Sequence, residues 1–180
     1  LMLHNLYSPN TAQNNMLSVH SNVMSQPGGS TWVADSLNES AIFNGRLVYN
    51  KGGAIIHTLR YIIDNDELFF DLLKAFQIDF ANSTATGLEF KAFAENFTGM
   101  DFTNFFNEWY FGEGYPTYSV QYNSVGTDVN VMVAQTTSVP ASISLFTNPV
   151  DLRITRSGGL GDTIVRIPIS SVQTYYTISG

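Results

Sequence analysis

The spacing of the hydrophobic residues changes once along this chain, near Pro116, and that change limits the folds that it can adopt. Before Pro116, apolar residues recur every three or four positions, which is the period of an α-helix with one buried face. After it, apolar and polar residues alternate, which is the period of a β-strand. The sequence therefore predicts the α+β class. We expect short α-helical hairpins over residues 1–116 and an antiparallel β-sandwich, itself truncated, over residues 117–180.

Capping and turn signals divide the first half into helices. A Pro-Gly-Gly stop at 27–29 ends the first helix, and Asp64 or Asn65 caps the third. Thr86 and Glu89 form a capping box that opens the fourth. Because short loops join the later helices, we expect them to stack as hairpins. The expected helices cover residues 11–24, 45–63, 64–80, 86–97 and 102–111.

The second half is expected to contain five or more strands. Two of them alternate strictly, at 118–122 and 129–133, and residues 123–128 between them have the composition of a hairpin turn. Further strands are expected at 143–146, 150–155, 163–169 and 175–178, with a glycine-rich hairpin turn at 156–162. Short antiparallel strands at this spacing are typical of a sandwich.

The charge composition narrows the classes of partner. Only 13% of the residues are charged and the net charge is −7, whereas about 25% of a typical globular chain is charged. Because phosphate binding needs a basic patch, this balance argues against nucleic acid and against an anionic membrane surface. No apolar run approaches the ~20 residues that span a bilayer, so no membrane partner is expected. The chain has no cysteine, which removes disulfide and thiolate chemistry.

The surface composition indicates an exported protein. Three Asn-x-Ser/Thr sequons, at Asn38, Asn82 and Asn96, accompany many Asn, Ser and Thr residues and few lysines. We therefore expect a secreted or periplasmic location. The chain begins Leu-Met-Leu-His, without the features of a secretion signal, and we interpret this start as a cut within a longer polypeptide.

The residue types that carry common catalytic chemistry do not form a complete set. The histidines are His4, His20 and His57, no two of them are four residues apart, and there is no His-Glu-x-x-His motif. A zinc site made by these three histidines is therefore disfavoured, and His57 is expected to be a structural histidine. There is also no Gly-x-Ser-x-Gly nucleophile motif. No metal ligands are predicted within this chain.

Tyr49, Gly52 and Gly53 form an unusual group in the second helix. Each glycine inside a helix costs about 1 kcal/mol relative to alanine, so the pair suggests that something approaches the helix closely. At 100° per residue, Tyr49 lies next to Val48 at the edge of the buried face. One explanation, which the residues alone favour, is a core tyrosine over a close helix crossing. The other is a tyrosine that the missing side chains leave open to a neighbouring molecule.

Two sequence elements are informative in combination. The first, "LVYNKGGAIIHTLRYIIDNDELFFDLLKAF", contains Tyr-x-Lys-Gly. The second, "TGMDFTNFFNEWYFGEGYP", contains Asn-x-Trp and Gly-x-Pro and leads into the strand "TYSVQY". In this order the two resemble the aminopeptidase N-like zinc metallopeptidases, the gluzincin aminopeptidases, and especially their secreted bacterial branch. The resemblance covers residues 43–122 well and the later strands more loosely.

The resemblance implies roles for four residues. Tyr49 matches a family tyrosine that faces the zinc site and donates a hydrogen bond to the substrate carbonyl oxygen when zinc-activated water attacks. A neutral phenol can donate without holding charge of its own, and one preorganised donor is worth about 3 kcal/mol of barrier. Lys51 matches a family lysine and is expected to give structural support. Gly52 and Gly53 would keep the site open.

The resemblance also implies what this chain lacks. The family's zinc ligands are two histidines of a His-Glu-x-x-His helix and a glutamate of the next helix, and the motif glutamate is the general base. None of these is present here. The chain is therefore expected to be the C-terminal fragment of a zinc aminopeptidase, a hydrolase of peptide N-termini, and to be inactive alone. Zinc would belong to the parent enzyme, and the partners would be a peptide substrate and the missing N-terminal part of the polypeptide.

The alternative is a non-catalytic pseudo-peptidase or binding module with helical and β-sandwich parts. In that case the parent would have no His-Glu-x-x-His motif before residue 1, and Tyr49 would be a core residue. The sequence therefore leaves open whether this chain belongs to an active enzyme.

Overall fold

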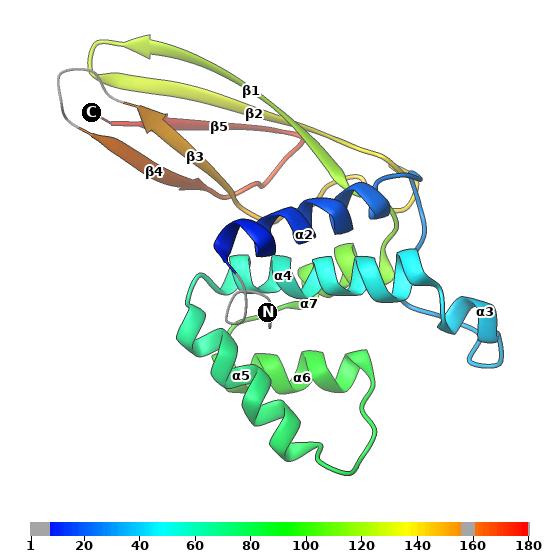
Figure 1. The fold of residues 1–180 in the computed structure, drawn as a ribbon. Helices are drawn as coiled ribbons and strands as arrows, with labels where there is room; N and C mark the ends of the chain where they lie inside the picture. The colour runs from blue at the N-terminus through cyan, green and yellow to red at the C-terminus, as the bar shows by residue number, and fades with distance from the viewer. Residues whose placement is uncertain (1–7, 156–160, 180) are drawn as a thin grey trace. The chain divides into compact units, whose positions relative to one another are not determined.

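A computed structural model describes residues 8–155 and 161–179 and shows two compact units (Figure 1). The first unit ends at Glu113 and contains the helices, and the second begins at Gly114 and contains the strands. The units divide just before Pro116, where the hydrophobic period changes. The α+β class expected from the sequence is confirmed.

The helical unit contains α-helices and two π-helical segments. Of the two candidate caps for the third expected helix, Asn65 is the cap, and its Oδ1 accepts a hydrogen bond from Leu68 N at 3.0 Å. Asp64 ends the preceding helix, with a φ of 53°. The segments are α2 (Pro9–Val23), α3 (Glu39–Ile42), η1 (Gly45–Lys51), α4 (Gly52–Ile63), α5 (Asp66–Asp79), α6 (Gly87–Thr98), α7 (Thr103–Phe105) and η2 (Phe106–Phe111).

The core of the helical unit lies where α4, α5, α6 and the segment before η2 meet. It is strongly aromatic, and the periodic residues of the three longer helices supply its centre. Because these positions recur at helical spacing, their burial fixes which face of each helix points inward. The most completely buried core side chains are those of Leu59, Phe69, Leu72, Ala94 and Phe102.

Two expected α-helices are partly π-helical, and in this respect the prediction was wrong. Residues 45–63 form η1 and then α4, and residues 102–111 form the short α7 and then η2. At the start of η1, Asn44 Oδ1 accepts a hydrogen bond from Leu47 N at 2.9 Å. The Asn44 carbonyl accepts from Val48 N at 2.9 Å and from Tyr49 N at 3.5 Å. The last of these spans five residues, which is the π-helical spacing and widens the turn.

Substitution of the capping residue Thr86 should destabilise the helical unit. Thr86 Oγ1 accepts from Glu89 N at 3.2 Å, and Glu89 Oε2 accepts from Thr86 N at 2.7 Å. We expect Thr86→Ala to lower the free energy of unfolding by about 1 kcal/mol. Denaturation followed by tryptophan fluorescence measures this, because both tryptophans lie in the helical unit. Thr84→Ala, in the exposed loop before the cap, is the control, and an equal loss in both variants would contradict the assignment.

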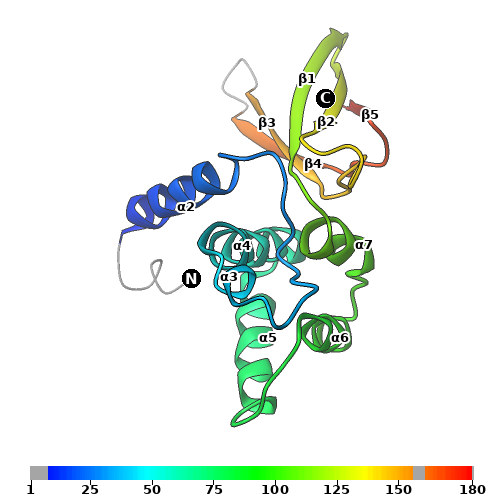
Figure 2. The same ribbon diagram turned by 90° about the vertical axis from the view of Figure 1, so that its right-hand side faces the viewer.

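In its described residues, the second unit consists of two antiparallel sheets (Figure 2). One has the order β1-β2-β5, from β1 (Pro116–Val125), β2 (Asp128–Thr137) and β5 (Gln173–Ile178). The other pairs β3 (Val150–Thr155) with β4 (Asp162–Ile167). The expected hairpin turn lies between β1 and β2, where Gly126 has a φ of 63°. Inward side chains of both sheets share one core, centred on Val131, Val133, Ile167 and Ile169.

The strand expected at 143–146 does not form, and a side chain explains why. The buried amide of Gln135 donates from Nε2 to the carbonyl of Phe146 at 2.9 Å and accepts from Phe146 N at 2.7 Å through Oε1. These two bonds satisfy the backbone groups that a strand partner would have used, so this segment is an anchored loop. The glycine-rich turn expected at 156–162 lies mostly outside the described residues.

Candidate functional site

Tyr49 lies on the surface of the helical unit and not in its core. Its side chain is 58% exposed, so the core-tyrosine explanation is wrong for this chain. The expectation used the 100° rotation of an α-helix, whereas Tyr49 belongs to the π-helical segment η1. A wider turn changes the direction in which each side chain points. The hydroxyl is therefore available to a molecule outside the described chain.

The glycine pair does not mark a close helix crossing either. A Cβ added at Gly52 would meet its nearest neighbour, Thr31 Cγ2, at 3.8 Å, which is an ordinary contact. A Cβ added at Gly53 would have no described atom within 4 Å. Packing within the described chain therefore requires neither glycine. Gly53 instead leaves open space one helical turn after Tyr49.

Replacing Gly53 with alanine should therefore stabilise the isolated chain. Alanine loses less backbone freedom in a helix, and the new methyl group would point into open space. We expect the free energy of unfolding to increase by about 0.5–1 kcal/mol, measured by denaturation under tryptophan fluorescence. Gly52→Ala is the matched comparison and should give a similar or smaller gain. A loss of stability in Gly53→Ala would show that a close contact is present after all.

Lys51 follows Tyr49 by two positions and, unlike Tyr49, is buried. Its side chain is only 3% exposed. The Nζ atom donates to the carbonyl of Gly29 at 2.8 Å and to the carbonyl of Gly112 at 2.9 Å. The ammonium group thus joins the loop before η1 to the end of η2. In this position it holds three segments of the helical unit together.

The charges around Lys51 fix the same loop. The pKa of Lys51 is lowered to about 8, chiefly by burial; the Glu113 carboxylate acts to raise it, and the Arg46 guanidinium acts to lower it. Glu113 Oε2 accepts from the backbone N–H of Gly29 at 2.8 Å, and Arg46 donates to the carbonyl of Gly28 at 2.9 Å. Gly29 itself has a φ of +105°, and a Cβ there would lie 2.6 Å from a methyl carbon of Leu47. The loop therefore lies directly against η1.

A second connection holds η1 on its other side. Asn50 Nδ2 donates to Asn22 Oδ1, on α2, at 2.8 Å. His20 also lies on α2, and burial lowers its pKa. Sequence analysis did not identify Arg46, Asn50 or Glu113, because their partners are either backbone atoms or residues more than 20 positions away. For Arg46 and Glu113 the scarcity of charged residues in this chain was a signal, and Asn50 had none.

The described residues do not fit a metal site. No group of three or more His, Cys, Asp or Glu side chains in the described ranges is placed to hold a metal ion. His20 lies on α2 and His57 lies on α4, near Arg60 and Asp66, while His4 lies outside the described residues. A zinc ion could not be assigned to this part of the chain. Any zinc ligands would have to come from elsewhere.

None of the helices in the described ranges has both the length and the apolar character needed to cross a membrane.

Comparisons with known proteins identify a structure with a similar fold. No protein-family model and no curated protein matches this chain. Among solved structures it is similar to aminopeptidase A from Legionella pneumophila, determined in complex with aspartic acid, with a TM-score of 0.63 and 12% sequence identity. The similarity covers 86% of this chain and 18% of that chain. The chain therefore has an aminopeptidase-like fold and spans less than a fifth of that protein.

Proposed function

We propose that this chain is the C-terminal part of the catalytic region, with the β-sandwich that follows it, of a larger exported zinc aminopeptidase, and that Tyr49 donates a hydrogen bond to the substrate. The observation that carries the proposal is the exposed Tyr49 hydroxyl on a π-helical segment, beside open space at Gly53. A tyrosine kept for packing would be buried. A tyrosine kept for chemistry must reach a molecule outside its own unit.

The surroundings of Tyr49 support this role. A catalytic donor is effective only when its backbone is held in place before the substrate arrives. Lys51 fixes the end of η1 through two carbonyls, and Asn50 ties the same segment to α2. The segment around Tyr49 is therefore anchored on two sides while its ring is left exposed.

The chemistry assigned to Tyr49 is electrostatic. When a nucleophile attacks a peptide carbonyl, negative charge develops on the carbonyl oxygen. The neutral phenol donates its hydroxyl hydrogen to that oxygen, and the bond strengthens as the charge grows. The open space at Gly53 gives a peptide main chain room to reach this hydroxyl.

Zinc belongs to this proposal only as a component of the parent enzyme. Because the described residues hold no ligand set, the zinc ligands and the general base are assigned to the part of the polypeptide before this chain. The expected partners are that missing part and a peptide substrate. We assign the parent to a secreted or periplasmic location on the basis of its Asn-, Ser- and Thr-rich, lysine-poor composition.

The gene region before Leu1 provides the direct test. A His-Glu-x-x-His motif followed by a glutamate in the next helix is expected there, in the same reading frame. The purified parent should retain one zinc ion per polypeptide after dialysis and release N-terminal residues from peptides. An upstream region without these ligands would refute the proposal and favour the non-catalytic binding module. Stoichiometric zinc in the present chain alone would also contradict it.

A further inference from the structure

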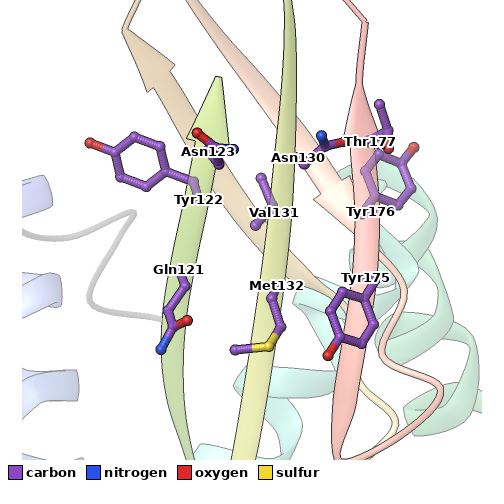
Figure 3. Close-up of a pocket in the computed structure, with 9 residues that line it drawn as sticks. All are labelled: Gln121, Tyr122, Asn123, Asn130, Val131, Met132, Tyr175, Tyr176 and Thr177. Carbon is purple, nitrogen blue, oxygen red and sulfur yellow. Dashed lines mark hydrogen bonds between the residues drawn. The ribbon is translucent and has the colours of Figure 1, made fainter. Parts of the chain in front are cut away.

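The outward face of the sheet β1-β2-β5 carries two rows of side chains (Figure 3). Positions in a strand alternate between faces, and Val131, on the opposite face, lies in the core of the strand unit. Every second residue along each strand, together with its partners on the neighbouring strands, therefore shares the outward face. A depression of about 430 Å³ lies over this part of the sheet. Its outward rows are Gln121, Met132 and Tyr175, and then Asn123, Asn130 and Thr177.

This face is almost free of charge. The face is made by every second residue of β1 from Thr117, of β2 from Asp128 and of β5 from Gln173. Among these residues only Asp128 is charged, and it lies next to the hairpin turn. The other sheet differs. It carries two ion pairs, Arg153 with Asp162 and Arg166 with Asp151. In a chain with a net charge of −7, a neutral, amide-rich face favours a neutral ligand over an ionic one.

The side chains on this face present groups that are free to bind. Tyr175 is 71% exposed, and its ring offers an apolar plane beside Met132. The amides of Gln121 and Asn123 make no side-chain hydrogen bond to the described residues. Asn130 Oδ1 accepts from Thr177 Oγ1 at 2.8 Å, which leaves the Asn130 NH₂ group available. Each side-chain amide carries an NH₂ group that donates and a carbonyl oxygen that accepts.

We propose that this face binds a neutral oligosaccharide. The C–H face of a pyranose ring packs on an exposed aromatic ring, here Tyr175, while adjacent hydroxyl groups need alternating donors and acceptors, here Gln121, Asn123 and Asn130. An extended peptide would instead use the edge of a sheet, where main-chain groups are unpaired. The proposal concerns a surface of the strand unit and does not depend on the role of Tyr49.

Calorimetric titration of the present chain tests this inference. The ligands are five neutral hexasaccharides: cellohexaose, xylohexaose, mannohexaose, maltohexaose and hexa-N-acetylchitohexaose. At least one should bind with a Kd below about 1 mM. Tyr175→Ala should weaken that binding at least about tenfold. Val120→Ala is the control, because Val120 is 43% exposed on the opposite face of the same sheet and does not line the depression, and it should bind as the unaltered chain does.

A second variant distinguishes a loss of binding contacts from a loss of the fold. Gln121→Ala removes an exposed amide without a side-chain partner, so it should leave the far-ultraviolet circular dichroism unchanged and still weaken binding severalfold. Absence of binding by all five hexasaccharides would overturn the proposal. So would an equal effect of Tyr175→Ala and Val120→Ala. Heparin and an uncharged peptide are titrated in the same way, and binding of either one in place of the neutral sugars, weakened by Tyr175→Ala, would also overturn the proposal.

Discussion

Replacing Tyr49 with phenylalanine in the full-length parent should lower kcat for peptide hydrolysis about 100-fold or more and change KM little. The ring remains, so packing around η1 is preserved, and only the hydroxyl is lost. That hydroxyl is assigned to the oxyanion that develops during the reaction, so its removal affects the transition state more than substrate binding. Steady-state kinetics with an aminoacyl amide substrate measure both constants.

Two controls sharpen this test. Tyr122→Phe removes the hydroxyl of another exposed tyrosine, which lies in the strand unit, and it should leave kcat unchanged. The unfolding transition of Tyr49→Phe should coincide with that of the parent, because 58% of the side chain is exposed. An unchanged kcat in Tyr49→Phe would remove the catalytic role and leave Tyr49 as a surface residue.

The free energy of unfolding of the helical unit should increase as the pH rises from about 8 to about 10.5. The pKa of Lys51 is lowered to about 8 in the folded chain from an ordinary value of 10.5. Between these values the unfolded chain binds more protons than the folded one, so stability rises with pH. Below pH 8 both states are protonated and the full cost of burying the charge is present. Over the whole window the gain is roughly 3 kcal/mol.

Other groups titrate in the same range, so the measurement must be a difference. Lys51→Met keeps the length of the side chain but cannot titrate. Subtracting its stability at each pH isolates the contribution of Lys51. Lys74→Met is the matched control, since its side chain is 71% exposed. Tryptophan fluorescence in urea at pH 7.5, 9 and 10.5 gives the values, and parallel pH profiles for wild type and Lys51→Met would contradict the assignment.

Local signals were sufficient for much of the fold. The cap residue Asn65, the capping box at Thr86 and Glu89 and the glycine turn at Gly126 lie where the sequence predicts them. In each case the residues that decide the structure are within five positions of one another. Hydrophobic periodicity likewise predicted helices with one buried face before Pro116, and α4 and α5 each bury one face in the same core.

The candidate site was less predictable, because it depends on contacts distant in sequence. The π-helical spacing of η1 involves the Asn44 carbonyl, and the loop around Gly29 that packs on it is fixed through Lys51 and Glu113. A hydrophobic pattern does not distinguish a bond over four residues from one over five. The exposure of Tyr49 followed from this difference. Gln135 shows the same limit, because its bonds to Phe146 replace an expected strand.

The bonds made by Lys51 have a consequence for a chain without cysteine. Gly29 and Glu113 are 84 positions apart. Lys51 lies within this segment and joins its two ends, because it donates to the carbonyls of Gly29 and Gly112. In an extracellular protein a disulfide commonly performs such a closure. Here the hydrogen bonds of one buried lysine side chain do so, and a reductant does not break them. The helical unit can therefore keep the same closed topology under oxidising and reducing conditions alike.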